Sequence, residues 1–278
     1  MSKVWFVTGA NSGIGAGIVT AALDAGDKVV ATGRSMDKLR VAFADAESDR
    51  LALVQLDVTD KGQAERAVGE AVARFGKVDV VVNNAGTAVL GNFEAFSLAD
   101  FDKQLGPNLY GVINVMQAAL PVMRKQRSGH IINISSVAGG VGQKHTSAYS
   151  AGKFAVEGLS MSVAQEVEQF GINVTIVEPG FFRSKLLDQA SASFVETTIE
   201  DYVTEGSTRD MWSAYDGNQN GNPYKLGKAL VQIATMDKPL KLFLAGSDAV
   251  EVLTPVVEER LKAIKDNAAL SVSTDGVD

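Results

Sequence analysis

Two residues of the chain have side chains and a spacing suited to moving a proton on and off an oxygen atom. Tyr149 and Lys153 are four positions apart, so on a helix they share one face. A free tyrosine has a pKa of about 10, and lowering it by ~3 units takes roughly 4 kcal/mol. One ammonium about 4 Å away supplies that at an effective dielectric near 20. We therefore predict that Lys153 lowers the pKa of Tyr149 and that Tyr149 is a general acid and base.

A third hydroxyl precedes this pair in the chain. Ser136 follows a predicted strand at 131–134, and the carboxyl ends of parallel strands are where α/β sheets bind ligands. We expect Ser136 to hydrogen-bond a substrate oxygen on which charge develops. Ser135 is the competing serine, but the spacing to Tyr149 favours Ser136. Because a Tyr-x-x-x-Lys spacing alone is common on helix surfaces, the strand-edge serine gives the pair its significance.

A glycine-rich turn stands near the start of the chain. A predicted strand at 4–7 leads into Thr8-Gly-Ala-Asn-Ser-Gly-Ile-Gly, and a helical pattern follows. Glycines let the backbone approach a pyrophosphate closely, and a helix N-terminus offers unpaired N–H groups to the phosphates. The pattern predicts dinucleotide contacts from Gly9, Asn11, Ser12, Gly13, Ile14 and Gly15.

The end of the second predicted strand indicates which dinucleotide binds. In a dinucleotide-binding strand–helix–strand unit, a carboxylate at the end of the second strand would accept hydrogen bonds from the 2′-hydroxyl of the NAD ribose. The stretch 32–35 holds no carboxylate and carries Arg34, whose charged fork suits a 2′-phosphate. The sequence therefore predicts NADP(H), with an ordinary exposed arginine as the alternative.

These residues require a scaffold in which strands and helices alternate. Nearly uninterrupted apolar runs, typical of strands buried on both faces, are separated by segments with helical spacing. The runs are 4–7, 28–32, 51–56, 78–82, 131–134 and 173–177, and a helix at about 223–236 precedes a last strand at 241–244. We predict an α/β fold: a three-layer, doubly wound parallel sheet of about seven strands, forming a single domain over residues 1–278.

Two stretches depart from this regularity. Residues 185–222 are polar yet carry large apolar side chains, which predicts a substrate lid, with a surface excursion as the alternative. Residues 268–278 lose apolar periodicity, which predicts a frayed tail or one docked on a partner subunit.

Composition narrows the classes of function. The chain has 278 residues, a net charge of −7 and no cysteine. No basic run offers a nucleic-acid surface, and no apolar run has the ~20 residues of a membrane span. His130 and His145 lack paired ligands at metal spacing, so we expect no metal site. These features predict a cytoplasmic protein that acts on a small molecule.

Taken together, the glycine spacing, Ser136, Tyr149 and Lys153 resemble the short-chain dehydrogenase/reductase family along the whole chain. The resemblance implies that Asp57 and Val58 contact the adenine, although Asp57 is also consistent with a simple turn. It implies further cofactor contacts from Asn84, Ala85, Gly86, Pro179, Gly180 and Ser184, and from Tyr149 and Lys153 themselves.

The resemblance also implies a fourth catalytic residue, Asn108, which holds a water in a proton relay behind the lysine. Pro107 departs from the family's pattern, and because proline removes an N–H we expect a bent helix there. For the substrate pocket the candidates are Val141, Gln143, His145, Phe181, Phe182, Met211 and Trp212.

The predicted function is hydride transfer with NADP(H) between a bulky or aromatic ketone or aldehyde and its alcohol. One rival is a sensor that binds NADP(H) without turnover. Another is an epimerase or dehydratase of nucleotide-sugars, although the chain is short after Pro179 for the larger C-terminal domain of those enzymes. The resemblance implies a homodimer or homotetramer.

Overall fold

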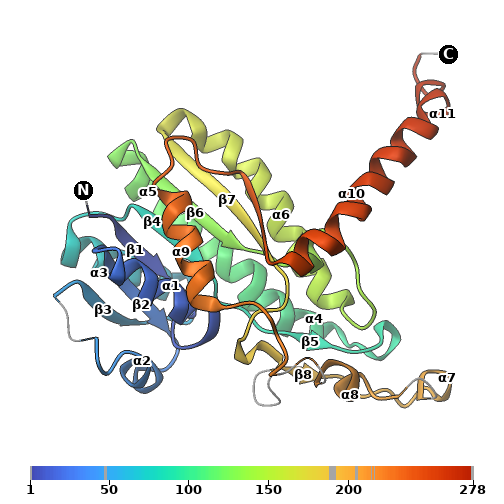
Figure 1. The fold of residues 1–278 in the computed structure, drawn as a ribbon, viewed down its shortest axis with the longest axis horizontal. Coiled ribbons are helices and arrows are strands. Elements are labelled where there is room, and N and C mark those ends of the chain that lie inside the picture. Colours follow the sequence, from blue (N-terminus) through green and yellow to red (C-terminus); the bar gives the residue numbers. More distant parts are fainter. Residues whose placement is uncertain are drawn as a thin grey trace.

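The computed structural model describes residues 2–46, 49–187, 192–203, 206–213, 215 and 217–276. At its centre is a parallel sheet of seven strands in the order β3-β2-β1-β4-β6-β7-β9, with helices on both faces (Figure 1). The strands are β1 (Val4–Val7), β2 (Lys28–Gly33), β3 (Leu51–Gln55), β4 (Val80–Asn83), β6 (Gly129–Ile134), β7 (Ile172–Pro179) and β9 (Leu242–Ala245). The predicted doubly wound sheet is confirmed, and every predicted strand is present with ends that differ by up to two residues.

Two hydrophobic cores lie on the two faces of this sheet. Successive side chains of a strand point to opposite faces, so Trp5 and Val7 enter one core while Phe6 enters the other. The first core is covered by α1 (Gly13–Asp24), α2 (Met36–Ala42) and α9 (Pro223–Ala234). The second is covered by α3 (Lys61–Phe75), α5 (Gly111–Gln126) and α6 (Ser147–Val167). Because both faces are covered, the strands consist of apolar runs rather than alternating patterns.

Two glycines let α1 and α9 cross closely. A Cβ on Gly227 would lie 2.5 Å from the carbonyl oxygen of Gly17, and a Cβ on Gly17 would lie 2.4 Å from the carbonyl carbon of Pro223. No larger side chain fits at either position without separating the helices. The first helix of the chain is therefore fixed by one of the last.

The order in which strands are added to the sheet reverses between β1 and β4. The chain first moves outward from β1 through β2 to β3, and it then returns to add β4 on the other side of β1. In sheets of this type the ligand crevice lies outside the carboxyl ends of the strands at such a reversal. The glycine turn follows β1, and Asn84 to Gly86 follow β4. Both predicted nucleotide segments thus lie at this edge.

Pro107 does not interrupt the helix in which it lies. The helix α4 (Leu98–Leu105) continues through a π-helical turn, Gly106–Tyr110, directly into α5. A π turn accommodates an extra residue per turn and is often found at functional sites. Pro107 is therefore accommodated in a π turn, and the expected bend stays a prediction.

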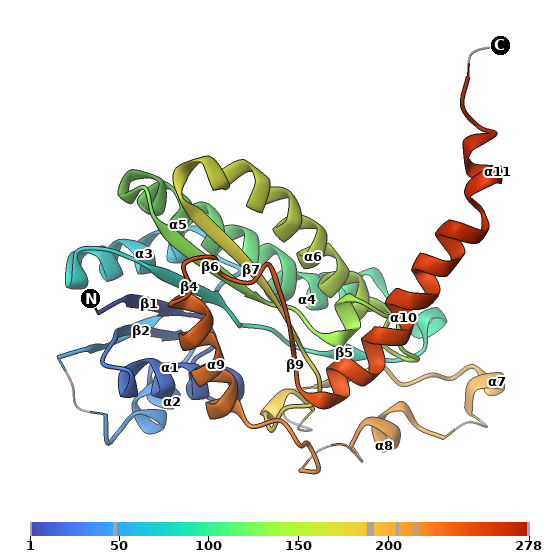
Figure 2. The same ribbon diagram turned by 45° about the horizontal axis from the view of Figure 1, so that its top comes forward.

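After β7 the chain runs along one end of the sheet (Figures 1 and 2). This segment contains β8 (Ser193–Phe194), α7 (Glu200–Val203) and α8 (Thr208–Ser213). The strand β8 pairs in parallel with β5 (Val89–Leu90), which follows the Asn-Asn-Ala-Gly turn. The predicted lid segment is thereby attached to the nucleotide side of the sheet, while 188–191, 204–205, 214 and 216 lie outside the described residues.

The C-terminal part is more regular than predicted. After α10 (Ser247–Asp266) the residues Ala268–Val272 form α11, so the first half of the predicted frayed tail is helical. The loss of apolar periodicity did not reveal this helix, because α11 forms through backbone hydrogen bonds, such as that from the Ser271 N–H to the Asn267 carbonyl, without buried side chains. The helix pair projects away from the body of the protein (Figures 1 and 2).

Short 3₁₀ turns complete the structure at Phe93–Ala95, Val137–Gly139, Glu168–Phe170 and Lys185–Leu187. No helix in the described part of the chain combines the length and apolar character needed to cross a membrane.

Candidate active site

A cleft of about 710 Å³ opens at the carboxyl edge of the sheet, where the strand order reverses. It brings together nearly all the residues predicted for catalysis and for cofactor binding. Those that line it are Gly9, Asn11, Ser12, Gly13, Ile14, Arg34, Asp57, Asn84, Ala85, Gly86, Asn108, Ser136, Tyr149, Lys153, Pro179, Gly180 and Ser184. Only Gly15 and Val58 of that set do not contribute to its wall. The proton-handling groups and the glycine turn thus share one cavity.

The glycine turn is shaped by backbone crowding. Gly9 and Gly13 have φ values of +62° and +54°, in the region that favours glycine. A Cβ on Gly15 would lie 2.4 Å from the carbonyl oxygen of Gly9, so any larger residue at this position would displace the turn. From β4, the Asn84 side-chain amide donates to the carbonyls of Thr8 at 2.9 Å and Gly9 at 3.1 Å. The turn therefore has a fixed shape that leaves the N-terminus of α1 facing the cleft.

The far end of the cleft carries two cations. Arg34 lines it directly after β2, and Lys38 on α2 lines it as well. Lys38 was missed from the sequence, because an exposed lysine on a helix has no distinguishing pattern. Both side chains are exposed, so they are accessible to an anion.

Asp57 and Val58 differ in their placement. The Oδ1 atom of Asp57 accepts hydrogen bonds from the N–H and the hydroxyl of Thr59, so it stabilises the turn as well as lining the cleft. Val58 is buried in the core beneath Gly111, and its carbonyl accepts from the Asn114 amide at 2.9 Å. The Val58 side chain therefore does not line the cleft, and the contact of this residue with the adenine stays a prediction.

The three predicted catalytic side chains come from two elements. Ser136 ends the loop after β6, where its Oγ accepts from the Ala138 N–H at 3.2 Å, and it hydrogen-bonds Tyr149. Tyr149 and Lys153 lie on the first two turns of α6. Lys153 is 6% exposed, and its Nζ donates to the Ile134 carbonyl at 2.8 Å. The strand end thus positions both the serine and the lysine.

The pKa of Tyr149 depends on its burial as well as on Lys153. Burial raises it above the usual value for tyrosine, and the hydrogen bond with Ser136 only partly opposes this. The Lys153 ammonium lies 5.7 Å from the centre of the Tyr149 ring and is committed to the Ile134 carbonyl. With the protein's own groups alone, desolvation outweighs the attraction of the ammonium for tyrosinate. Burial also lowers the pKa of Lys153 to about 8, opposed by the nearby Glu157.

Asn108 lies at the π turn and is 2% exposed. Its Oδ1 accepts from the Thr87 N–H at 2.9 Å, and its Nδ2 donates to the Thr87 carbonyl at 3.1 Å. The side chain is therefore locked to the segment that follows Gly86. The water relay assigned to Asn108 by the resemblance stays a prediction.

Ser135, the competing serine, is placed differently from Ser136. Its Oγ is buried beneath the Val137–Gly139 turn, 2.4 Å from where a Cβ on Gly139 would lie. Two carboxyl groups are packed under the same turn, Glu157 and Glu178. Burial raises the pKa of Glu178 to about 7, and the neighbouring Glu157 adds to the effect. Ser135 therefore also lines the cleft, but its hydroxyl is buried under the turn beside these carboxyl groups.

On the substrate side, Gln143, Phe181, Phe182 and Trp212 line the cleft as predicted. Phe181 stacks on Tyr215 with centroids 4.7 Å apart, and Trp212 lies 5.8 Å from Tyr215. The segment after β7 therefore places an aromatic cluster beside Tyr149, with Ala88 and Leu90 completing the apolar wall.

Three of the predicted pocket residues do not line the cleft. Val141 packs beneath α10 against Val137 and Leu253. His145 is buried in a left-handed conformation with φ +65°, and its carbonyl accepts from the Gly91 N–H. Met211 is 39% exposed and does not contribute to the wall of the cleft. Proximity in sequence to Ser136 or Trp212 did not indicate which way these side chains point.

The remaining histidine, His130, lies within β6, where its Nε2 hydrogen-bonds Thr175 Oγ1 at 2.7 Å. Burial lowers its pKa to about 4, so it is neutral near pH 7. Within the described ranges, no three His, Cys, Asp or Glu side chains gather as a metal site would require.

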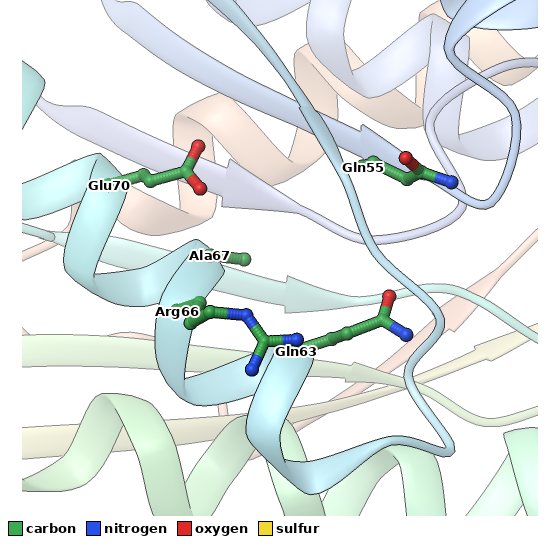
Figure 3. Close-up of a pocket in the computed structure, with 5 residues that line it drawn as sticks. All are labelled: Gln55, Gln63, Arg66, Ala67 and Glu70. Atoms are coloured by element: carbon green, nitrogen blue, oxygen red, sulfur yellow. The ribbon is translucent and has the colours of Figure 1, made fainter.

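A smaller depression of about 260 Å³ lies beside α3, lined by Gln55, Gln63, Arg66, Ala67 and Glu70 (Figure 3). The Gln63 side chain already has a hydrogen-bond partner within the protein, since its Oε1 accepts from the Asp57 N–H at 2.9 Å. The depression is polar and none of the predicted catalytic groups faces it, so the larger cleft is the candidate active site.

Comparison with known proteins shows which proteins the chain resembles in sequence and in fold. The family profile described as short chain dehydrogenase matches residues 3–193. An oxidoreductase of Botryotinia fuckeliana, BOA17, is 40% identical over 253 residues, covering 90% of this chain and 91% of the relative. A crystal structure of a short-chain dehydrogenase from Streptomyces avermitilis superposes with a TM-score of 0.89 at 36% identity, covering 99% of this chain and all of the other.

Nicotinamide dinucleotides are found in structures of this fold. ElxO, which is 27% identical with a TM-score of 0.74 over 90% of this chain and all of its own, holds NADP, and another structure of the fold holds NAD. The fold is therefore compatible with both forms of the cofactor.

Proposed function

The chain belongs to the short-chain dehydrogenase family, and we propose that it is an NADP(H)-dependent reductase of bulky, apolar ketones or aldehydes, working reversibly on the alcohols. The observation that carries the proposal is one shared cleft. The Ser136, Tyr149 and Lys153 side chains line the same cavity as the glycine turn and Arg34.

The residues of the cleft fit such a dinucleotide. The pyrophosphate belongs at the N-terminus of α1, where Ser12, Gly13 and Ile14 line the wall and the crowding at Gly9 and Gly15 excludes larger side chains. Arg34 and Lys38 are placed to bind the 2′-phosphate that distinguishes NADP from NAD. No carboxylate in 32–35 repels that phosphate.

A nicotinamide bound in this cleft would supply the hydride. Tyr149 donates its proton to the oxygen of the carbonyl as negative charge develops, and takes it back in the oxidation. Ser136 hydrogen-bonds the same oxygen, so the oxyanion forms between two hydroxyls. Lys153, held by the Ile134 carbonyl, favours the tyrosinate that remains after proton transfer.

The aromatic side of the cleft supports a bulky, apolar substrate. Phe181 and Trp212 line it, and the neighbouring Ala88 and Leu90 add apolar surface. Pockets of this kind bind through buried apolar area, while a few polar groups fix the orientation. The lid function of 185–222 belongs to this proposal, since its described part contributes Trp212 and Gln219 to the wall.

The test is a panel of ketones and aldehydes assayed with NADPH and with NADH by nicotinamide absorbance. We expect turnover with NADPH, a higher kcat/KM for aromatic and branched substrates than for acetone, and weaker use of NADH. Tight NADPH binding without turnover of any substrate or alcohol would instead favour the sensor, and product formation with no net change in NADPH would favour an epimerase or dehydratase.

A further inference from the structure

The wall of the cleft is positively charged, whereas the chain as a whole is acidic. The chain has 33 acidic and 26 basic residues, which give a net charge of −7. Among the described residues that line the cleft, Asp57 is the only carboxylate, and the cations are Arg34, Lys38, Lys103, Lys153 and Lys185. A hollow lined by one sign of charge raises the local concentration of ligands of the opposite sign. The cleft is therefore suited to anions.

Four of these five cations lie where a bound dinucleotide accounts for them. Arg34 and Lys38 lie at the end of the cleft assigned to the 2′-phosphate, and Lys153 belongs to the catalytic group. Lys185 lies beside the glycine turn, since its backbone nitrogen is 3.9 Å from where a Cβ on Gly13 would lie. It is therefore placed at the pyrophosphate end. The fifth cation lies elsewhere.

This fifth cation, Lys103, lies in the substrate half of the cleft. Its Nζ donates to Ser193 Oγ at 2.6 Å, and both residues line the wall. Ser193 belongs to β8, which pairs with β5, and its neighbour Phe194 packs in the same aromatic cluster as Tyr149. The next residue along α4, Gln104, is fully buried and accepts a hydrogen bond from the backbone of β5 at 2.6 Å, which fixes α4 against β5. The Lys103 ammonium is thus placed at the wall that surrounds the substrate.

The Lys103 ammonium retains hydrogen-bonding capacity for a ligand. An ammonium has three N–H donors, and Ser193 accepts from one of them. Asp100, one turn earlier on α4, does not line the cleft, and its Oδ2 already accepts from the N–H and the hydroxyl of Ser97. The Ser193 hydroxyl accepts from Lys103 and keeps its own hydrogen for a further acceptor. Two donors, one of them charged, therefore lie together on this part of the wall.

We propose that the substrate carries an acidic group, such as a carboxylate, at the end remote from its carbonyl, and that Lys103 and Ser193 bind this group. The carbonyl lies at Ser136 and Tyr149 and the apolar body lies along the aromatic wall, so the acidic end reaches α4. The inference rests on the proposed reductase function and narrows its substrate class to apolar ketones or aldehydes with an acidic end. Lys103 is then a residue that determines specificity, because its ammonium favours the acid over a neutral analogue of the same shape.

The first experiment compares acids with their methyl esters, which keep the shape and lose the charge. The substrates are phenyl ketones whose chain ends in a carboxylate, with two to six methylenes between the carbonyl and the acid, assayed with NADPH. For the best-fitting length we expect kcat/KM of the acid to exceed that of the ester about 10-fold, in line with a hydrogen bond to a charged group. Lys103→Gln should bring that ratio close to one, and Lys103→Arg should retain it. The control is Lys125→Gln, at an exposed lysine near the end of α5.

Three results would overturn the inference: no preference for the acid at any length, a preference that survives Lys103→Gln, or an equal loss for acid and ester in that variant. The last result would show that the bond from Lys103 to Ser193 only joins α4 to β8. Turnover of the esters in each of these cases leaves the proposed reductase function standing, so the two failures are distinguishable.

The second experiment needs no turnover. With NADP⁺ bound there is no hydride to transfer, so the binding of each keto acid and of its ester is measured by calorimetry as a dead-end complex. We expect the acid to bind about 10-fold more tightly than the ester, and Lys103→Gln to abolish the difference. The difference should also shrink between about 20 mM and about 300 mM salt, because salt screens the charge of an exposed ammonium. Tighter binding of the acid without turnover by NADPH would support the acid site and refute the reductase function, whereas equal binding of acid and ester by the wild type would overturn the inference.

Discussion

The two halves of the cleft are built in different ways. The nucleotide half consists of short turns at the ends of β1, β2 and β4, fixed by backbone hydrogen bonds such as those from the Thr8 N–H to the Val82 carbonyl and from the Ala10 N–H to the Thr32 carbonyl. The substrate half is formed by a long excursion after β7, held by the two residue pairs between β5 and β8 and by stacking of Phe181 on Tyr215. One half depends on the backbone and the other on side chains, so substitutions in the two halves should have separable effects.

The largest expected effect is on the rate of the chemical step, with cofactor binding unchanged. Tyr149→Phe removes the proton donor while keeping the ring, so kcat should fall about 1000-fold, within the usual contribution of acid–base catalysis. NADPH affinity, measured by fluorescence titration, should stay within about twofold. Tyr110→Phe, a change at an exposed tyrosine, serves as the control. Undiminished kcat in Tyr149→Phe would remove the proposed mechanism.

A second substitution tests the backbone character of the nucleotide half. Gly15→Ala places a methyl group 2.4 Å from the Gly9 carbonyl oxygen, so the glycine turn must move. Overpacking of this kind costs about 1–3 kcal/mol, and we expect NADPH affinity to fall on the order of 100-fold. The matched control is Gly69→Ala on α3, where a Cβ meets no atom within 4 Å. Equal affinities in the two variants would contradict the role given to Gly15.

Cofactor choice should respond to a change of charge at the end of β2. Arg34→Glu exchanges a partner of the 2′-phosphate for a carboxylate, so kcat/KM with NADPH should fall roughly 30-fold, in line with hydrogen bonds to charged groups. The kcat/KM of this variant with NADH should rise or stay constant. Arg40→Glu, on the helix α2 that follows Arg34 and in a surface pair with Asp37, should change neither. A parallel loss with both cofactors would show that Arg34 is structural.

In the substrate half, Trp212→Ala removes an aromatic wall of the cleft. We expect KM for a bulky ketone to rise about 10-fold, consistent with losing part of a buried aromatic contact, while NADPH affinity is retained. Met211→Ala is the neighbouring control, since Met211 lies outside the cleft. If Trp212→Ala weakens NADPH binding instead, the separation of the two halves fails.

The smallest effect concerns stability. Glu178 has a pKa of about 7 in the fold against an ordinary 4.5, so the folded protein holds this proton more tightly than the unfolded chain. Stability is therefore lost as the pH rises from about 4.5 through 7. Glu178→Gln should raise Tm at pH 8 by about 2–4 °C, as expected for ~1 kcal/mol in a domain of this size, and change it little at pH 4. The exposed Glu166→Gln is the control, and a Tm gain for Glu178→Gln that does not depend on pH would exclude the linkage.

The same contrast explains what the sequence could predict. The strands were located because burial on both faces leaves a continuous apolar run, as in Val4–Val7, and the glycine turn because few residues tolerate its conformation. Val141, His145 and Met211 were misplaced because the direction of a side chain in an irregular segment depends on distant packing, such as that of Leu253 on Val137. The desolvation that raises the pKa of Tyr149 in the chain alone was missed for the same reason, since it arises from tertiary contacts.

The close crossing of Gly17 and Gly227 also affects how the protein is made. These residues are separated by 210 positions, so the face of α1 that α9 covers stays bare until nearly the whole chain has left the ribosome. At about 5–20 residues per second, the delay is roughly 10–40 s. During that time the nascent chain exposes the apolar face of α1 that α9 covers in the folded protein.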